Sequence, residues 1–167
     1  MRPAAAALAL LLLVFFVAGL AVPSWSISDS AVSKASLEQL WAWYADPKEW
    51  PNWDHLVQRV EAREPFADGS SARTIANGIA MPSVLRDVVP NTRYTELLRM
   101  PLATMKATHE LRRVAGGTRV DHALVVSGPG AWLYELTQRS SLERGMHAAL
   151  QRLASRAAYG LPTSYIP

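Results

Sequence analysis

The stretch that decides the fold is Trp41–Asp54, which reads Trp-Ala-Trp-Tyr-Ala-Asp-Pro-Lys-Glu-Trp-Pro-Asn-Trp-Asp. It completes an amphipathic helix that begins after Ser36, a good N-cap with Gln39 three residues further on. Asp46-Pro47 then starts a second helix, because Asp accepts free N–H groups and Pro is tolerated in the first turn. We expect Pro51 to end this helix quickly. The run therefore predicts two short helices in close succession.

Strand patterns lie on both sides of this run. Before it, Trp25, Ile27 and Ala31 alternate with serines, as in a half-buried strand. After it, six strands are expected between turns rich in Gly, Pro, Asn and Asp. They cover Val60–Glu64, Ser70–Ile75, Ser83–Val89, Arg93–Met100, Thr104–Val114 and Thr118–Ser127. Their order predicts an antiparallel meander.

The last predicted element is one long helix over Ala131–Tyr159, after a break at Gly128-Pro129-Gly130. An antiparallel sheet must bury one face, and this helix is the only predicted element long enough to cover it. We therefore predict an α+β fold in which an antiparallel β-sheet curves around a long C-terminal α-helix, preceded by an N-terminal hydrophobic helix. The expected segments are 1–23, a signal peptide or membrane anchor, 24–160, the folded domain, and 161–167, a C-terminal tail.

The N-terminal segment from Ala4 to Val22 contains only apolar residues and glycine, behind a single Arg2. As a helix it would be about 28 Å long, close to the roughly 30 Å hydrocarbon core of a bilayer. This length favours a retained anchor over a cleaved signal peptide, whose apolar region usually has about 7–15 residues, while Gly19-Leu20-Ala21 offers a signal-peptidase site. In either case Arg2 predicts an extracytoplasmic domain. The protein is expected to be single-pass in the cell membrane, or secreted or periplasmic if the segment is cleaved.

Composition excludes several classes of function. The 167 residues, half of them hydrophobic, suffice for one compact domain with a short appendage. The net charge of +3 comes from charges scattered singly, so no nucleic-acid partner is expected. The absence of cysteine removes disulfides, thiolate metal sites and a Cys nucleophile.

Metal and cofactor motifs are also absent from the sequence. The four histidines show no paired ligand spacing, so no metal site is expected; they are His55, His109, His122 and His147. No Gly-rich phosphate loop and no Gly-x-Ser-x-Gly elbow occur, so no cofactor and no serine hydrolase are expected.

The chain resembles the START-like, helix-grip superfamily, also called SRPBCC, and in particular its polyketide cyclase/dehydrase-type members. The resemblance spans about residues 24 to 160. It is carried by Val32–Trp41, Asp46–Asp54, Phe66–Gly69, Gly116–Val120 and the transition from Gly128 into the last helix. It implies an apolar cavity between sheet and helix that holds a lipid, sterol, polyketide or other hydrophobic small molecule. It does not imply catalysis, because the family has no single fixed catalytic motif.

Two histidines are the candidate chemical groups of that cavity. If Gly116-Gly117 is a two-residue hairpin turn, His109 and His122 are diagonal neighbours on one sheet face, roughly 7 to 8 Å apart at the backbone. That face also carries Met105, Ala107, Leu111, Val120, Leu124 and Val126 and is expected to line the cavity. The imidazoles could act as general acid and base or orient a ligand carbonyl. Alternatively, each is a core histidine bonded to a neighbour or to water.

The preceding strand pair is harder to orient. With Asn91-Thr92 as the turn, Asp87 faces Glu96 and Leu85 faces Leu98, and neither face of the pair is uniformly apolar. An inward Glu96 would be a candidate base, whereas a carboxylate near a sheet edge is usually solvated.

Aromatic residues complete the predicted site. Leu37, Leu40, Trp41 and Tyr44 share the apolar face of the first short helix, and Trp50 and Trp53 are expected to clamp the short helices to the sheet. Trp132 and Tyr134 open the long helix near the expected cavity mouth, where they could contact a ligand, meet the bilayer interface, or simply pack. The predicted ligand-binding set is Met105, His109, Leu111, His122, Leu124, Val126, Trp132 and Met146.

Two functions follow, with a third possibility. The favoured one is binding or transport of a lipid-like small molecule next to a membrane, with no catalysis and with the N-terminal helix as the membrane contact. The alternative is a cyclase or dehydratase acting on a polyketide-like substrate, with His109 and His122 as acid–base groups. The third is an interaction domain with a filled core and no ligand.

Overall fold

The computed structural model describes residues 3–21, 23–76 and 78–162. Seven strands form one antiparallel sheet in the order β1-β7-β6-β5-β4-β3-β2. The strands are β1 Ser24–Ser33, β2 Val57–Ala62, β3 Ser71–Ala76, β4 Ile79–Val89, β5 Arg93–Met100, β6 Ala103–Val114 and β7 Gly117–Ser127. The helices are α1 Pro3–Ala21, α2 Leu37–Tyr44, the 3₁₀ turn η1 Pro47–Glu49, α3 Trp50–Trp53 and α4 Ala131–Tyr159. The predicted fold class is thereby confirmed.

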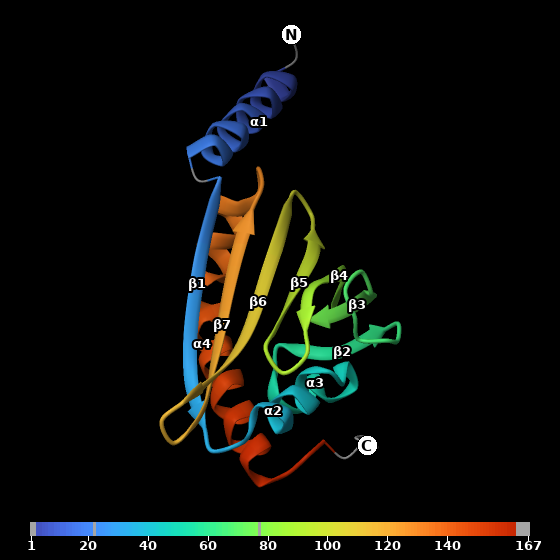
Figure 1. The fold of residues 1–167 in the computed structure, drawn as a ribbon. Coiled ribbons are helices and arrows are strands. Elements are labelled where there is room, and N and C mark those ends of the chain that lie inside the picture. Colours follow the sequence, from blue (N-terminus) through green and yellow to red (C-terminus); the bar gives the residue numbers. More distant parts are fainter. Residues whose placement is uncertain (1–2, 22, 77, 163–167) are drawn as a thin grey trace.

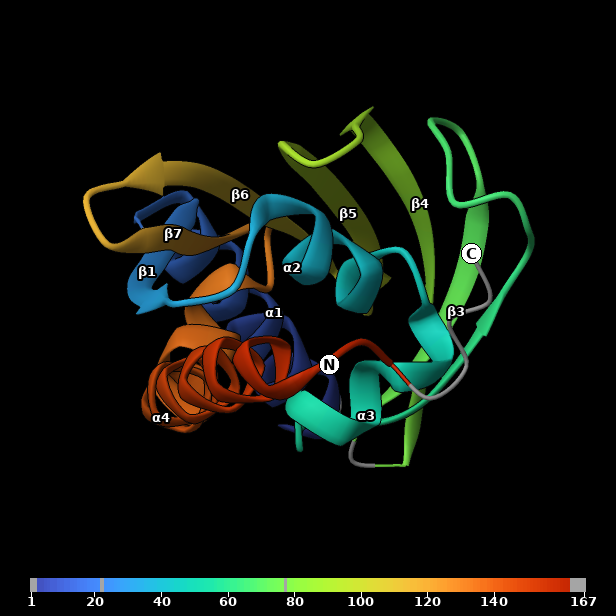
Figure 2. The same cartoon turned by 60° about the horizontal axis from the view of Figure 1, so that its bottom comes forward.

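The sheet curves around α4 (Figures 1 and 2). In Figure 2 the strands form an arc from β1 to β3, with α4 near one end of the arc and α2 and α3 inside it. Tryptophan side chains fix both ends of α4. Trp25 Nε1 of β1 donates to the carbonyl of Ala131 at 2.8 Å, and Trp43 Nε1 of α2 donates to that of Gly160 at 3.1 Å. The helix is therefore held by β1 at its first residue and by α2 just after its last residue.

The short helices begin as predicted but end differently. Ser36 and Gln39 form a complete capping box before α2, and the Asp46 side chain accepts from Lys48 N at the start of η1. The prediction that Pro51 ends the second helix is wrong. Pro51 lies in the first turn of α3, where its missing N–H removes no helical hydrogen bond, and α3 continues to Trp53.

Both hairpin registers differ from the predicted ones. In the β6–β7 hairpin, Val114 pairs with Gly117, so the turn is Ala115-Gly116 and His109 lies directly opposite His122. Gly116 occupies the turn with φ of 85°, whereas Gly117 meets the end of β1, where a Cβ would lie 2.0 Å from the Ser33 carbonyl oxygen. The second glycine is therefore required by a close backbone approach rather than by the turn. The two histidines keep the predicted shared face.

In the β4–β5 hairpin, Val89 pairs with Arg93 and Leu85 pairs with Glu96. The predicted pairs of Leu85 with Leu98 and of Asp87 with Glu96 are wrong, because the turn is Pro90-Asn91-Thr92 and a bulge between Arg86 and Val89 shifts the register further. Asp87 takes a positive φ of 52° in this bulge. The inner face that results is buried; it carries Ser83, Leu85, Tyr94, Glu96 and Leu98.

Helix α1 extends beyond the domain, and most of its side chains are exposed (Figure 1). It is therefore not a buried core helix. Among the described residues it is the one helix long and apolar enough to cross a membrane, over Ala4–Ala21, a property that signal sequences share. Arg2, Asn77 and tail residues 163–167, which also carried predictions, lie outside the described residues.

Candidate functional site

A cavity of about 130 Å³ lies between the inner face of the sheet, α3 and α4. Apolar side chains from the strands and from α4 form much of its wall; among them are Met81, Leu98, Met105, Leu124, Leu142 and Met146. Polar side chains also reach this wall, from β5, β6, β7 and the end of α3. The cavity is thus an apolar space with a defined set of polar groups.

His109 and His122 meet at the centre of this wall. Because they are direct cross-strand partners, their ring centroids lie 4.3 Å apart, with the rings at 79°. Nε2 of His122 shares a 2.7 Å hydrogen bond with the hydroxyl of Tyr44, which descends from α2. Burial lowers the pKa of His122 to about 3, although Asp121 and Asp29 oppose this effect. His122 is therefore neutral at physiological pH and keeps one acceptor nitrogen.

His109 is held by stacking. Its ring lies parallel to that of Tyr94, with centroids 4.2 Å apart and planes within 6°. Burial, reinforced by His122, lowers the pKa of His109 well below its usual value. Its Nδ1 and the Tyr94 hydroxyl are both buried and make no hydrogen bond to any described residue. Such unpartnered buried groups are costly unless something satisfies them.

Glu96 provides a carboxylic acid in the same cavity. Its side chain is only 5% exposed and accepts a 2.9 Å hydrogen bond from Thr74 Oγ1 on β3. The expectation of a solvated carboxylate at the sheet edge is therefore wrong, because β5 lies inside the sheet and Glu96 shares its inner face with the buried Tyr94 and Leu98. Burial raises its pKa, while the hydroxyls of Ser83 and Thr74 oppose the rise. Asp54, partly exposed just after α3, also lines the cavity, and burial raises its pKa too.

The predicted ligand-binding residues divide into two groups. Met105, His109, His122, Leu124 and Met146 all line the cavity. The other three lie elsewhere. Leu111 and Val126 are fully buried in the core, and Trp132 packs against Phe15 of α1 with centroids 5.6 Å apart.

Sequence reasoning missed Tyr44, Tyr94 and the cavity-facing Trp53 as site residues, and it offered Glu96 only as a candidate base in case the side chain pointed inward. Tyr44 was expected only to pack on the apolar face of α2, and Tyr94 and Glu96 were given the wrong register. The signal that could have found them is the alternation Tyr94, Glu96, Leu98, which places all three on one face.

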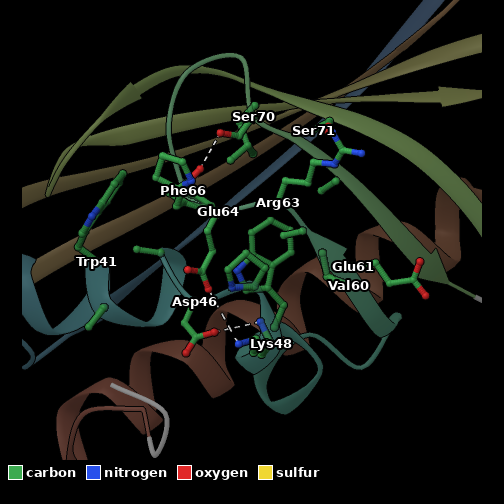
Figure 3. Close-up of a pocket in the computed structure, with 18 of the residues that line it drawn as sticks. Trp41, Asp46, Lys48, Val60, Glu61, Arg63, Glu64, Phe66, Ser70 and Ser71 are labelled. Atoms are coloured by element: carbon green, nitrogen blue, oxygen red, sulfur yellow. Dashed lines mark hydrogen bonds and ion pairs between the residues drawn. The ribbon is translucent and has the colours of Figure 1, made fainter. Parts of the chain in front are cut away.

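A second, larger pocket of about 820 Å³ lies outside the sheet-and-helix interior, between α2, η1 and the β2–β3 connection (Figure 3). Trp41 and Phe66 lie in its inner wall, whereas charged side chains such as Lys48, Arg63 and Glu64 stand at its rim. Trp50 borders both this groove and the inner cavity, and stacks on Tyr94 with centroids 5.9 Å apart. An aromatic wall therefore separates the two spaces.

Metal chemistry has no site among the described residues, where no group of three or more His, Asp or Glu side chains is arranged to hold an ion. What the arrangement offers instead is hydrogen bonding and proton exchange. Two imidazoles, the Tyr94 phenol and the carboxyl groups of Glu96 and Asp54, both with raised pKa values, line one apolar space, and the Tyr44 hydroxyl is hydrogen-bonded to His122.

Comparison with solved structures supports the same fold. The di-domain ARO/CYC StfQ from the steffimycin biosynthetic pathway superposes with a TM-score of 0.68 at 12% identity, over 81% of this chain and 51% of that chain. Ara h 8.0201 superposes with a TM-score of 0.65 at 12% identity, over 82% of this chain and 99% of that chain. A protein from Rhodobacter sphaeroides superposes with a TM-score of 0.64 at 20% identity, over 80% of this chain and 92% of that chain. At these identities the likeness concerns the fold alone.

Sequence comparison is more specific. No curated protein matches the chain. The model of the family described as polyketide cyclase / dehydrase and lipid transport matches residues 24–158, which is nearly the whole region of the predicted resemblance. The chain therefore belongs to the polyketide cyclase/dehydrase and lipid transport family, of the SRPBCC, helix-grip type.

Proposed function

We propose that this protein binds an apolar, lipid-like small molecule in the inner cavity and carries it next to a membrane. The observation that carries this proposal is the pairing of an apolar wall with the buried, unpartnered Tyr94 hydroxyl and His109 Nδ1. A ligand with one polar group among apolar atoms would bury its apolar part against Leu124 and Met146 and satisfy one or both of these atoms. Membership of a family associated with lipid transport agrees with this proposal.

The size of the cavity limits which ligands can enter it without a change in the structure. Apolar cavities of about 150 Å³ hold a benzene molecule, whereas pockets for larger ligands measure roughly 300–1,000 Å³. At about 130 Å³ the cavity accepts one ring or the end of a chain. A longer ligand therefore requires its wall to move. The half-buried Leu56, Met81 and Leu142 are the side chains whose displacement would enlarge it.

The test is native mass spectrometry of the full chain, released from detergent after exposure to a membrane lipid extract. We expect a reproducible apolar adduct on the wild type and on Val125→Lys, because Val125 faces outward on β7. The neighbouring Leu124→Lys should lose the adduct, since it places a charge in the cavity. Thermal unfolding of both variants checks that each is folded. A bare mass for the wild type, or equal adducts on both variants, contradicts the proposal.

A second candidate function is catalysis, and the hydrogen bond between Tyr44 and His122 beside the buried Glu96 favours it. This set could deliver and accept a proton during cyclisation or dehydration of a polyketide-like substrate. The double variant His109→Ala, His122→Ala separates the two functions. If the protein is an enzyme, the double variant should still fold but should no longer convert the molecule identified by mass spectrometry. If it is a carrier, the double variant should lose only affinity for that molecule.

We further propose that α1 remains attached and anchors the domain on the extracytoplasmic side of the cell membrane. Support comes from its length and from its exposed apolar side chains. Intact-mass analysis of the protein from cell membranes tests this directly. Recovery of a chain that begins near Pro23 or Ser24 would replace the anchor by a cleaved signal peptide and a secreted or periplasmic domain.

A further inference from the structure

The connection between α1 and the domain is very short. Helix α1 ends at Ala21 and β1 begins at Ser24, so only residues 22 and 23 lie between them. A chain reaches about 3.3–3.6 Å per residue when fully extended, so this connection spans roughly 10 Å. If α1 crosses a membrane, as proposed above, the adjoining end of the domain must lie at the bilayer surface.

Three connections gather at that end of the domain. The amide of Gly128, after β7, donates to the carbonyl of Pro23 at 3.0 Å. The amide of Gly130, just before α4, donates to the carbonyl of Leu102 in the β5–β6 turn at 2.8 Å. These bonds tie the β5–β6 turn and Pro23 to the segment between β7 and α4. Figure 1 shows all three connections at the end of the domain next to α1.

Helix α1 also packs directly on this end. A Cβ on Gly19 would lie 2.6 Å from the carbonyl oxygen of Pro129, so the glycine allows a close backbone approach. Four residues earlier, Phe15 contacts the ring of Trp132 in the first turn of α4. Aromatic side chains, Trp above all, are enriched at the level of the lipid headgroups.

Large apolar side chains are exposed beside this junction. Leu102, Leu133 and Leu136 are 61%, 42% and 78% exposed. Leu133 and Leu136 are three residues apart on α4 and so share one side of the helix. The neighbouring Glu135 is paired with Arg139, so its charge is compensated.

Leu102 is unusual in its backbone as well as its exposure. It is the second residue of a two-residue turn after Pro101 and has a φ of 58°. Turns of this kind favour Gly or Asn there, because a left-handed conformation costs an ordinary residue free energy. A bulky apolar residue at this position stabilises neither the turn nor the core. We therefore infer that the Leu102 side chain contacts something outside the domain.

We propose that Leu102, Leu133 and Leu136 insert into the headgroup region of the bilayer that holds α1, so that the domain rests on the membrane by this end. The bilayer is the occupant because the short connection holds this end of the domain, which carries the three leucines, at the surface that α1 enters. Cavity-lining Leu142 lies six residues after Leu136 on α4, about 9 Å along the helix axis. The contact therefore places an apolar ligand in the bilayer close to the cavity wall.

The absence of cysteine from the chain permits a direct test. The full chain is reconstituted into phosphatidylcholine vesicles as single variants Leu102→Cys, Leu133→Cys and Leu136→Cys, each labelled with bimane. The matched control is Val32→Cys, also 61% exposed but at the opposite end of β1. Lipids brominated in the upper acyl chain then quench any probe within reach, and intact mass verifies that residues 1–23 are present.

We expect quenching at the three leucine positions to exceed that at position 32 by at least threefold. Flotation with the vesicles but equal quenching at all four positions overturns the inference and leaves the anchor intact. Failure of the full chain to float with the vesicles overturns both the inference and the proposed anchor.

Discussion

The two halves of the sheet differ in what covers them. The half near α4, which contains β1 and β7, packs on that helix, and Leu150 and Leu153 are fully buried there. The half that contains β2 to β5 has no long helix over it (Figure 2). It is covered by η1, α3 and aromatic side chains such as that of Trp50, which stacks on Tyr94. Both the cavity and the outer groove border this second half. A single helix cannot cover a seven-stranded curved sheet, and the remaining space holds the candidate site.

The largest expected effect compares two leucines of α4. Leu153 is fully buried against the covered half, whereas Leu142 lines the cavity and is only half-buried. We expect Leu153→Ala to lower the free energy of unfolding by about 2–5 kcal/mol and Leu142→Ala to lower it by clearly less. Urea titration of both variants measures the difference. Equal losses would mean that the two halves are packed alike.

The next effect concerns pH. A histidine is about half protonated at pH 6.5 in the unfolded chain, but burial lowers the pKa of folded His122 to about 3. The unfolded state therefore binds more protons below pH 6.5, and stability present above that pH is lost as the pH falls towards 3. The loss amounts to about 3 kcal/mol at pH 4.

Urea titrations from pH 7 to pH 4 test this expectation. The wild type should lose more stability over this range than His122→Gln, because the variant lacks the buried imidazole. Parallel curves for the wild type and His122→Gln would show that His122 titrates normally and is accessible to water.

Glu96 should act in the opposite direction. Because burial raises its pKa, stability present at low pH is lost as the pH rises through the folded pKa. Glu96→Gln should therefore be more stable than the wild type at neutral pH, with the difference vanishing in acid. Glu110→Gln, half-buried on the outer face, is the control and should show no such gain. A less stable Glu96→Gln at pH 7 would indicate that the ionised carboxylate is itself well stabilised.

The smallest stability effect is expected at Gly145 of α4. A Cβ there would lie 2.3 Å from Leu56 Cδ1, in the cavity wall. Because Leu56 can rotate away, and because Ala favours a helix by about 1 kcal/mol over Gly, we expect Gly145→Ala to change stability by less than about 1 kcal/mol. The displaced side chain should instead speed ligand exchange, which competition with an unlabelled ligand measures. A loss of several kcal/mol would show that Leu56 is rigidly packed.

Local signals in the sequence predicted much of this molecule. The predicted capping box at Ser36 is present, and β5 and α4 begin and end at the predicted residues. These features depend mainly on residues that are close together in the sequence. The two registers failed for non-local reasons. In the β6–β7 hairpin, Gly117 resembles a turn residue, but a glycine is needed there because the Ser33 carbonyl of β1 lies too close for a Cβ. In the β4–β5 hairpin, the bulge has no clear signal in the sequence. The alternation of Tyr94, Glu96 and Leu98 shows that these residues share one face of β5, but that this face is the buried one depends on its pairing with β6.

The measurement that tests the account most directly is NMR of ¹³C-labelled methionine methyl groups, with benzene added as a probe. Met81, Met105 and Met146 line the cavity, whereas Met100 packs elsewhere against the core. In the full chain held in nanodiscs, we expect saturable shifts of the three cavity methyls and none at Met100. Unchanged cavity methyls, or equal shifts at all four, would contradict the claim that the space between the sheet, α3 and α4 is an apolar binding site.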